Sequence, residues 1–292
     1  MDEIKISSHF VTARISSFGA ELKGLKDRES NIEYIWQGDS DHWERSAPIL
    51  FPIVGSLRED KYRIGRKYYG MSRHGFARDS EFEIIEKEKD SVKLRLIQSD
   101  ETLKIFPFKF SLDVRYKVYG PKLIISYEVK NLDRKEMFFS IGSHPAFNVP
   151  LNKGQLEDYF VEFEKREEKG AYYLHNGLVD FHSPDDKTMM IDDKRIELTK
   201  DLFKSDALIF KDPDSKRVFL KNSFDEHSVT IDFGDIPYLG LWAPEGAPFV
   251  CIEPWYGVAD ATDSNNDFVI KEGLISLEQE KSFKCEYTIH VN

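Results

Sequence analysis

The stretch Phe249–Asp260 has the residue types expected of a proton-transfer site. A short apolar run, Phe249–Ile252, is typical of a strand covered on both faces, and Glu253 follows it. Pro254 predicts that the strand stops there, because proline cannot continue a central ladder. Beside Trp255 the Glu253 carboxylate is poorly solvated, so its pKa should rise and make it a base near neutral pH. A core strand running into an ordinary turn is the alternative interpretation.

Two histidines occur in stretches of similar character. Arg73 and Arg78 flank His74 in a short polar and aromatic loop, and the alternative interpretation is a surface turn with solvated arginines. His144 follows an apolar run and is succeeded by Pro145, as Glu253 is by its own proline. The alternative for this histidine is a core residue with its hydrogen bonds satisfied. A position at a strand end favours the functional interpretation.

A carboxylate and several aromatic side chains complete the candidate set. Asp206 lies shortly before the buried run Leu208–Phe210. Four aromatic residues could stack on the apolar face of a sugar ring: Trp36, Trp242, Trp255 and Tyr256. Together with the histidines and arginines, these residues suit proton transfer on a polar substrate.

Other chemistries lack their sequence signatures. Neither a His-x-x-x-His spacing nor paired cysteines occur, so we expect no metal site. Glycine loops that cradle phosphates, dinucleotide fingerprints and a serine in a nucleophile elbow are also missing. We therefore expect a reaction that needs no cofactor.

The elements that must position these residues are strands. Hydrophobic residues alternate with polar ones through Phe108–Val118 and again through Leu123–Val129, and Gly120-Pro121 between them predicts a hairpin. Such alternation is typical of antiparallel sheets with one solvated face. Helical periodicity is nearly absent, and no linker divides the chain, so we predict an all-β fold, one large antiparallel β-sandwich domain over residues 1–292. The proline-rich but apolar segment Ala47–Leu57 predicts a buried, irregular wall of a site.

Composition limits the partners. The net charge of −11 and pI of about 5.3 argue against nucleic acid or an anionic membrane surface. Neither a run of about 18 apolar residues nor a signal-peptide core is found. Cys251 and Cys285 lie in apolar strand-like runs and are expected to be buried and unpaired. We expect a cytoplasmic protein, monomer or homodimer, that binds a small molecule.

Six short motifs, in chain order, resemble the aldose 1-epimerase (galactose mutarotase) family, and its LacX-like branch most closely. They are Gly19-Ala20-Glu21-Leu22, LFPIVG, HGFAR, GSHPAFN, DALIF and CIEPWYGVAD. The resemblance runs from about Gly19 to the C-terminus and implies a galactose mutarotase-like β-supersandwich. It implies that Glu253 is the general base on the anomeric hydroxyl and His144 the general acid toward the ring oxygen. It also implies that His74 binds near the ring oxygen and that Asp206 holds sugar hydroxyls.

The substrate arginine departs from the pattern of this branch. Many LacX-like chains carry arginine after LFPxVG, where this sequence has Ser56, so Arg78 is the preferred substrate arginine and Arg73 the reserve. The resemblance implies a mutarotase that interconverts the α and β anomers of an aldohexose. A hexose-6-phosphate mutarotase and a non-catalytic sugar-binding protein are the alternatives. A glycosidase with Asp206 and Glu253 as its two carboxylates would leave the histidines without a role.

Overall fold

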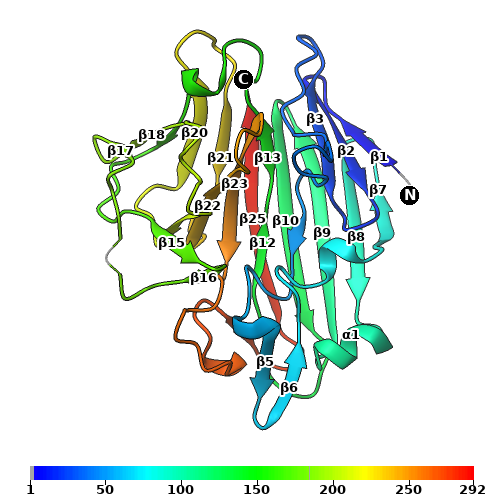
Figure 1. Ribbon diagram of the computed structural model, residues 1–292. Helices are drawn as coiled ribbons and strands as arrows, with labels where there is room; N and C mark the ends of the chain where they lie inside the picture. The colour runs from blue at the N-terminus through cyan, green and yellow to red at the C-terminus, as the bar shows by residue number, and fades with distance from the viewer. Residues whose placement is uncertain (1–2, 184) are drawn as a thin grey trace.

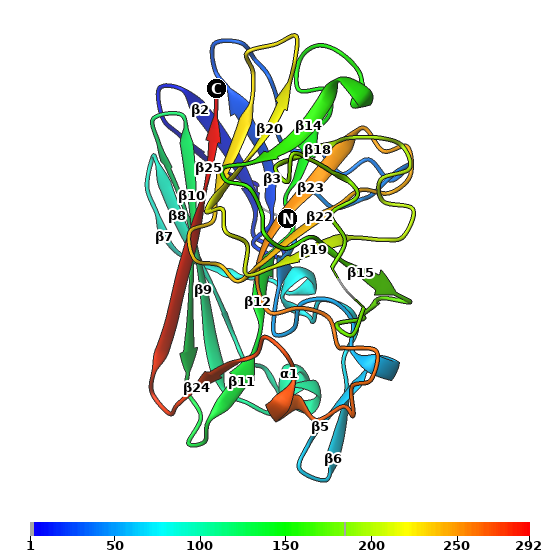
Figure 2. The same ribbon diagram turned by 90° about the vertical axis from the view of Figure 1, so that its left-hand side faces the viewer.

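The computed structural model describes residues 3–183 and 185–292, and two large antiparallel sheets dominate it (Figures 1 and 2). The larger, called sheet I here, has 10 strands. In spatial order they are β17 (Met190–Ile191), β18 (Arg195–Glu197), β14 (Tyr159–Phe163), β20 (Arg217–Asn222), β21 (Val229–Asp232), β25 (Ser282–Val291), β10 (Lys122–Asn131), β9 (Phe110–Tyr119), β8 (Ser91–Ile97) and β7 (Glu83–Lys87).

Sheet II has 8 strands and carries the candidate residues of the C-terminal half. Its order is β16 (Leu178–Val179), β15 (Tyr172–His175), β19 (Leu208–Lys211), β22 (Tyr238–Trp242), β23 (Phe249–Tyr256), β12 (Ile141–Ser143) and β4 (Ile49–Leu50), with β13 (Ala146–Asn148) also paired to β23. Among the described residues every pairing between these strands is antiparallel.

Smaller elements surround the two sheets. They are a sheet of β1 (Glu3–Ser7), β2 (Val11–Ser16) and β3 (Leu22–Asp27), a hairpin of β5 (Lys61–Ile64) and β6 (Lys67–Gly70), and a pair of β11 (Met137–Phe139) and β24 (Ile275–Leu277). Short 3-10 turns lie at Arg58–Asp60, Ala77–Asp79, Leu156–Asp158 and Phe268–Ile270. One short α-helix, α1 (Asp100–Ile105), is capped by Ser99, whose side chain accepts from the Thr102 N–H. No helix in the described ranges is long and apolar enough to cross a membrane.

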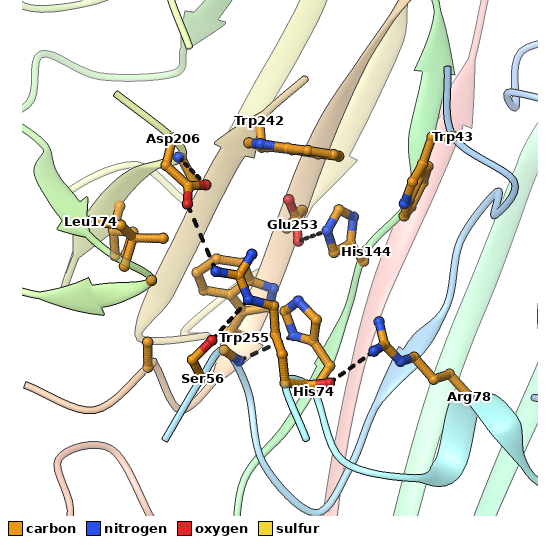
Figure 3. A pocket seen from close by; sticks show the side chains of 16 residues that line it. Trp43, Ser56, His74, Arg78, His144, Leu174, Asp206, Trp242, Glu253 and Trp255 are labelled. Carbon is orange, nitrogen blue, oxygen red and sulfur yellow. Dashed lines mark hydrogen bonds and ion pairs between the residues drawn. The ribbon is translucent and has the colours of Figure 1, made fainter. Parts of the chain in front are cut away.

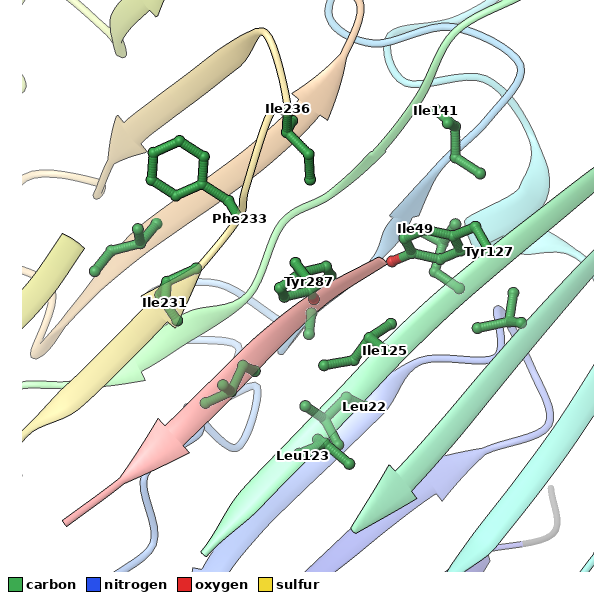
Figure 4. Packing of buried hydrophobic residues seen from close by; sticks show 14 of the residues in the cluster. Leu22, Ile49, Leu123, Ile125, Tyr127, Ile141, Ile231, Phe233, Ile236 and Tyr287 are labelled. Carbon is green, nitrogen blue, oxygen red and sulfur yellow. The ribbon is translucent and has the colours of Figure 1, made fainter. Parts of the chain in front are cut away.

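The main core lies between sheets I and II. On β9 and β10 the alternating apolar residues point inward, as the sequence pattern predicts. Ile125 and Tyr127 belong to one buried cluster with Ile141 and Ile49 of sheet II (Figure 4). Tyr287 of β25 lies in the same layer. This packing confirms the prediction of an antiparallel β-sandwich.

Strand β23 corrects one sequence-based expectation. The prediction that the strand stops at Pro254 is wrong, because β23 continues to Tyr256. The Ile252 N–H donates to the Pro145 carbonyl at 3.2 Å, so the nitrogen of Pro254, two residues later, faces the same neighbour. That neighbour is interrupted between β12 and β13. The missing N–H of the proline therefore removes no ladder hydrogen bond.

Candidate active site

The alternation of β23 separates the core from a pocket. Val250 and Ile252 point into the main core, whereas Cys251, Glu253 and Trp255 lie on the opposite face of sheet II. On that face Glu253 and Trp255 form the floor of an open pocket lined by polar and aromatic side chains. Glu253 is thus held by a central strand, although its side chain points away from the main core.

His144 lies opposite Glu253 across the interrupted ladder. β12 and β13 pair with β23 in one continuous register, Gly142 with Trp255 and Ala146 with Cys251. Continuing that register across the gap sets His144 against Glu253, and His144 Nε2 lies 3.2 Å from Glu253 Oε2 (Figure 3). The spacing of the pair is therefore fixed by strand pairing.

His74 reaches the same pocket from a loop whose backbone is tightly constrained. Its φ is +70°, and a side chain at Gly75 would meet the Phe51 carbonyl oxygen at 2.3 Å, so this turn requires a glycine there. His74 Nδ1 accepts a hydrogen bond from the Gly55 N–H at 3.1 Å. The remaining proton of the neutral ring is therefore on Nε2, which is available as a donor. The ring centre lies 5.6 Å from that of His144.

The two candidate arginines line the pocket but have different contacts. Arg73 Nε donates to Ser56 Oγ at 2.8 Å, and its Nη2 lies 3.9 Å from Asp206 Oδ2 across the pocket. Arg78 turns back on its own loop, where Nη2 donates to the Arg73 carbonyl at 2.9 Å and Nε lies 3.6 Å from Asp79. Arg73 thus joins the two walls, and Arg78 supports the loop that carries it.

Three tryptophans enclose the histidine. Trp43 and Trp242 lie with their ring centres 4.9 and 5.6 Å from that of His144, and Trp255 lies beneath Glu253 (Figure 3). Trp36, a stacking candidate from the sequence, is instead buried behind Trp43 and donates from Nε1 to the Trp43 carbonyl at 2.8 Å.

Tyr256, the other stacking candidate, points to the main core and packs edge-on against Phe283. Sequence reasoning missed Trp43 as a wall residue, because it lies in an irregular loop without periodicity. All seven residues chosen from the sequence as site residues line the pocket: Arg73, His74, Arg78, His144, Asp206, Trp242 and Glu253. The lining residues that sequence reasoning did not select are mostly small or apolar: Gly55, Ser56, Leu174, Gly177, Ala207, Ile209 and Ala259.

Burial dominates the electrostatics of the pocket floor. Burial raises the pKa of the Glu253 carboxyl well above its ordinary value, the direction expected from the sequence, although the Trp255 N–H opposes this. Burial also lowers the pKa of His144 to about 3 and that of His74 well below its ordinary value. Glu253 and His144 therefore hold one proton between them, and burial favours the uncharged acid and imidazole over the ion pair.

Cys251 adds a third potential metal ligand. Its sulfur and one ligand atom each of His144 and Glu253 lie within 4.8 Å of one another, and all three residues are buried. The thiol packs in a cluster with Trp36 and Phe249, and burial raises its pKa well above the ordinary value. A thiol in this environment is a poor metal ligand, because only the thiolate binds metals well.

Comparison with known proteins identifies relatives along nearly the whole chain. The aldose 1-epimerase family profile matches residues 2–268. The plasmid-encoded protein LacX of Lactococcus lactis subsp. lactis is 34% identical over 274 residues, which cover 90% of each chain.

Solved structures show the same fold. A galactose mutarotase related enzyme from Lactobacillus acidophilus superposes with a TM-score of 0.94 and 32% identity, covering 100% of this chain and 97% of its own. A galactose mutarotase-like protein from Lactobacillus casei superposes with a TM-score of 0.91 and 34% identity over 100% of both chains. The predicted galactose mutarotase-like fold is thereby confirmed, and the chain belongs to the aldose 1-epimerase family.

Proposed function

We propose that this protein is a mutarotase that interconverts the α and β anomers of a free aldohexose. The observation that carries the proposal is the pair of Glu253 and His144, 3.2 Å apart on the floor of an open pocket walled by tryptophans. The pair offers one proton donor and one acceptor within reach of a single sugar ring, which is what ring opening requires.

The reaction moves two protons and breaks one bond. Glu253, as the carboxylate, takes the proton of the anomeric hydroxyl O1, and a carbonyl forms at C1. The C1–O5 bond breaks with its electron pair going to O5, which receives a proton from the His144 imidazolium. Rotation about C1–C2 and the reverse steps close the other anomer and restore both groups. Acid and base catalysis each contribute roughly 10²–10⁴-fold.

The proton count of the pair matches this cycle. Glu253 and His144 share one proton before and after ring opening, and only its position changes. Because burial favours the uncharged form, the ion pair that starts the reaction needs support from neighbouring donors. The Trp255 N–H and Arg73 both act to lower the pKa of Glu253 and so favour that form.

Hydroxyl recognition is assigned to the rim of the pocket. His74 offers its Nε2 proton near the ring oxygen, and Asp206 and Arg73 offer an acceptor and donors on the opposite wall. Trp242 and Trp43 present aromatic faces and edges beside His144, suited to the apolar face of a sugar.

A neutral sugar is favoured over a phosphorylated one. Arg73 is paired with Asp206, and Arg45 and Arg78 with Asp79, so acids already offset these guanidinium charges. The second candidate, a hexose 6-phosphate, is favoured by the same arginines, because their combined field adds to the effect of burial in lowering the pKa of His144. Three guanidinium groups near one pocket would suit a dianion.

Mutarotation followed by polarimetry or NMR, with a panel of free and phosphorylated aldoses, tests the proposal. We expect accelerated anomer exchange for at least one free hexose, and its loss in Glu253→Gln. Binding without acceleration would instead indicate the third candidate, a sugar-binding protein on this fold.

A further inference from the structure

We infer that Trp255 is a positioning residue for Glu253: its indole ring fixes the carboxylate at the pocket floor and directs an N–H toward it. This role rests on the proposed function, in which Glu253 is the base. Stacking on a sugar does not by itself explain why Trp255 lies beneath Glu253.

The ring is held in a slot between strands β12 and β22 that two glycines create. A Cβ atom at Gly142 would lie 2.5 Å from Cδ1 of the indole, and one at Gly240 would lie 2.4 Å from Cη2. Both distances are far below van der Waals contact, so any side chain at either position would displace the ring. The indole therefore spans from β12 to β22 across β23, and its orientation is fixed by backbone on both sides.

Two buried polar groups beside this slot form no hydrogen bond, although His144 Nε2 lies 3.2 Å from one of them, Glu253 Oε2. Trp255 Nε1 and Glu253 Oε2 are both buried, and neither has a hydrogen-bond partner of full geometry. A buried polar group without a partner is unfavourable, so a slot that orients this N–H needs an acceptor. Gly240, against which the far end of the indole lies, is the register partner of Glu253, so the Glu253 side chain leaves the same face of the sheet beside the ring. The lowering effect of the indole N–H on the pKa of Glu253, which opposes that of burial, agrees with this placement.

The other groups facing Glu253 are less able to support its charge. Cys251 on the same strand and His144 on the neighbouring strand are both held uncharged by burial. Asp206 raises the pKa of Glu253, and Arg73 lowers it from a position where Ser56 and Asp206 already engage the guanidinium. The indole N–H, which has no other partner, is thus the donor on the same strand that can support the charge of Glu253.

Trp255→Phe is the first test, because phenylalanine keeps an aromatic ring and removes the N–H. We expect kcat to fall about tenfold with KM changed less than about twofold, the pattern for an interaction that favours the transition state. We also expect the acid limb of the kcat profile to move up by about one pH unit, as a carboxylate that loses a donor should. If kcat fell and KM rose by the same factor, and the pH profile of kcat did not move, Trp255 would not be a positioning residue for Glu253.

A second variant separates the N–H from the shape of the ring. Trp255→3-benzothienylalanine replaces the N–H by sulfur in a nearly identical bicycle, so the slot between the glycines stays filled. We expect it to reproduce the shifted profile of Trp255→Phe. Wild-type behaviour would show that the N–H has no role, and would overturn the inference even if the phenylalanine variant folds poorly.

Direct titration of the carboxyl makes the test independent of turnover. Carbon-13 NMR of labelled glutamate, with Glu253→Gln to assign the signal, should report a higher pKa of Glu253 in both Trp255 variants. Trp242→Phe removes another indole N–H from the same pocket and should leave that pKa within about 0.3 pH units of the wild type. If the protein had no mutarotase activity, a pKa shift would still support the contact, and an unchanged pKa would overturn it.

Discussion

Two buried carboxylates, one on each large sheet, have opposite electrostatics. Asp113 on β9 is 4% exposed and Glu253 on β23 is 1% exposed. Each lies opposite a basic residue, Arg95 of the neighbouring strand β8 for Asp113 and His144 in the gap between β12 and β13 for Glu253. Yet the pKa of Asp113 is lowered and that of Glu253 is raised. Burial alone therefore does not decide the charge of either acid.

The partners account for the difference. Burial would raise the pKa of Asp113, but Arg95 donates to both of its oxygens at 2.6 and 2.7 Å, and Lys93 lies 2.7 Å away. These cations reach solvent along the outer face of sheet I, so they remain charged. His144 is itself buried and loses its charge, so it cannot support a carboxylate in the same way. Asp113, with cations at both oxygens, stabilises the fold, whereas Glu253 lacks such partners and stays available for proton transfer.

Removing the Glu253 carboxylate should have the largest effect on turnover. Glu253→Gln keeps nearly the same shape but cannot accept the O1 proton, so we expect kcat to fall about a thousandfold with sugar binding retained. Polarimetric mutarotation and calorimetric binding measure the two quantities. Near-normal turnover in this variant would remove Glu253 from the mechanism.

Removing the Asp113 carboxylate should lower the stability of the fold and leave turnover unchanged. Asp113→Asn leaves Arg95 and Lys93 without a carboxylate, and we expect the free energy of unfolding to fall by about 1–2 kcal/mol, a value reduced because water screens these cations. Chemical denaturation at pH 7 measures this change, and kcat should match the wild type. A large loss of activity would contradict the separation of the two sheets by role.

The two acids should also give stability profiles of opposite slope. Glu253 has a raised folded pKa, so its stabilising contribution is complete below 4.5 and is lost as the pH rises above that value. Above pH 4.5 the free energy of unfolding of Glu253→Gln should therefore increase relative to that of the wild type, by up to about 1.4 kcal/mol per pH unit.

The pKa of Asp113 is lowered in the folded state, so its contribution to stability is complete above pH 3.8 and is lost as the pH falls below that value. Asp113→Asn should therefore approach the wild type only in acid. Unfolding midpoints measured from pH 3 to 8 check both slopes, and parallel profiles for the two variants would refute the contrast.

Arg95 and Arg73 differ in the same way as the two acids, and we expect a smaller effect from removing Arg73. Arg95 binds its carboxylate through two short contacts, whereas the contact of Arg73 with Asp206 is a longer one of 3.9 Å that a sugar hydroxyl could replace. We expect Arg73→Gln to raise KM about tenfold, a loss of about 1.4 kcal/mol, with kcat nearly unchanged and little salt dependence. Arg45→Gln, which touches only the loop around Asp79, is the matched control. A larger rise in Arg78→Gln would assign the sugar contact to Arg78, as the sequence alone favoured.

The sequence predicts sheet I well, because its strands are solvated on one face. Phe110 to Val118 alternate with polar residues along β9, and this period of two reads directly as a half-buried strand. In sheet II both faces of β23 are covered, so no alternation separates core from pocket. The continuation through Pro254 could not be foreseen, because it depends on a gap in a strand more than a hundred residues away.

The site residues differ in the same way. Glu253 and His144 stand beside prolines in apolar runs, an unusual local pattern that distinguishes them within the sequence itself. Trp43 has no such local pattern, because its place beside His144 is set by the path of a loop and by contacts with Trp36 and Trp242. The choice between Arg73 and Arg78 is also not local, because it depends on Ser56 and Asp206 from other segments.

The interrupted ladder between β12 and β13 constrains how this chain can change in evolution. Glu253 and His144 owe their spacing to strand register, so one residue inserted between Cys251 and Glu253 would turn the carboxylate toward the main core. The turn at Gly177, between β15 and β16 on the rim of the pocket, has no such restriction. Insertions and deletions among relatives should therefore collect at this rim, where they alter which sugars enter and leave the proton-transferring pair intact.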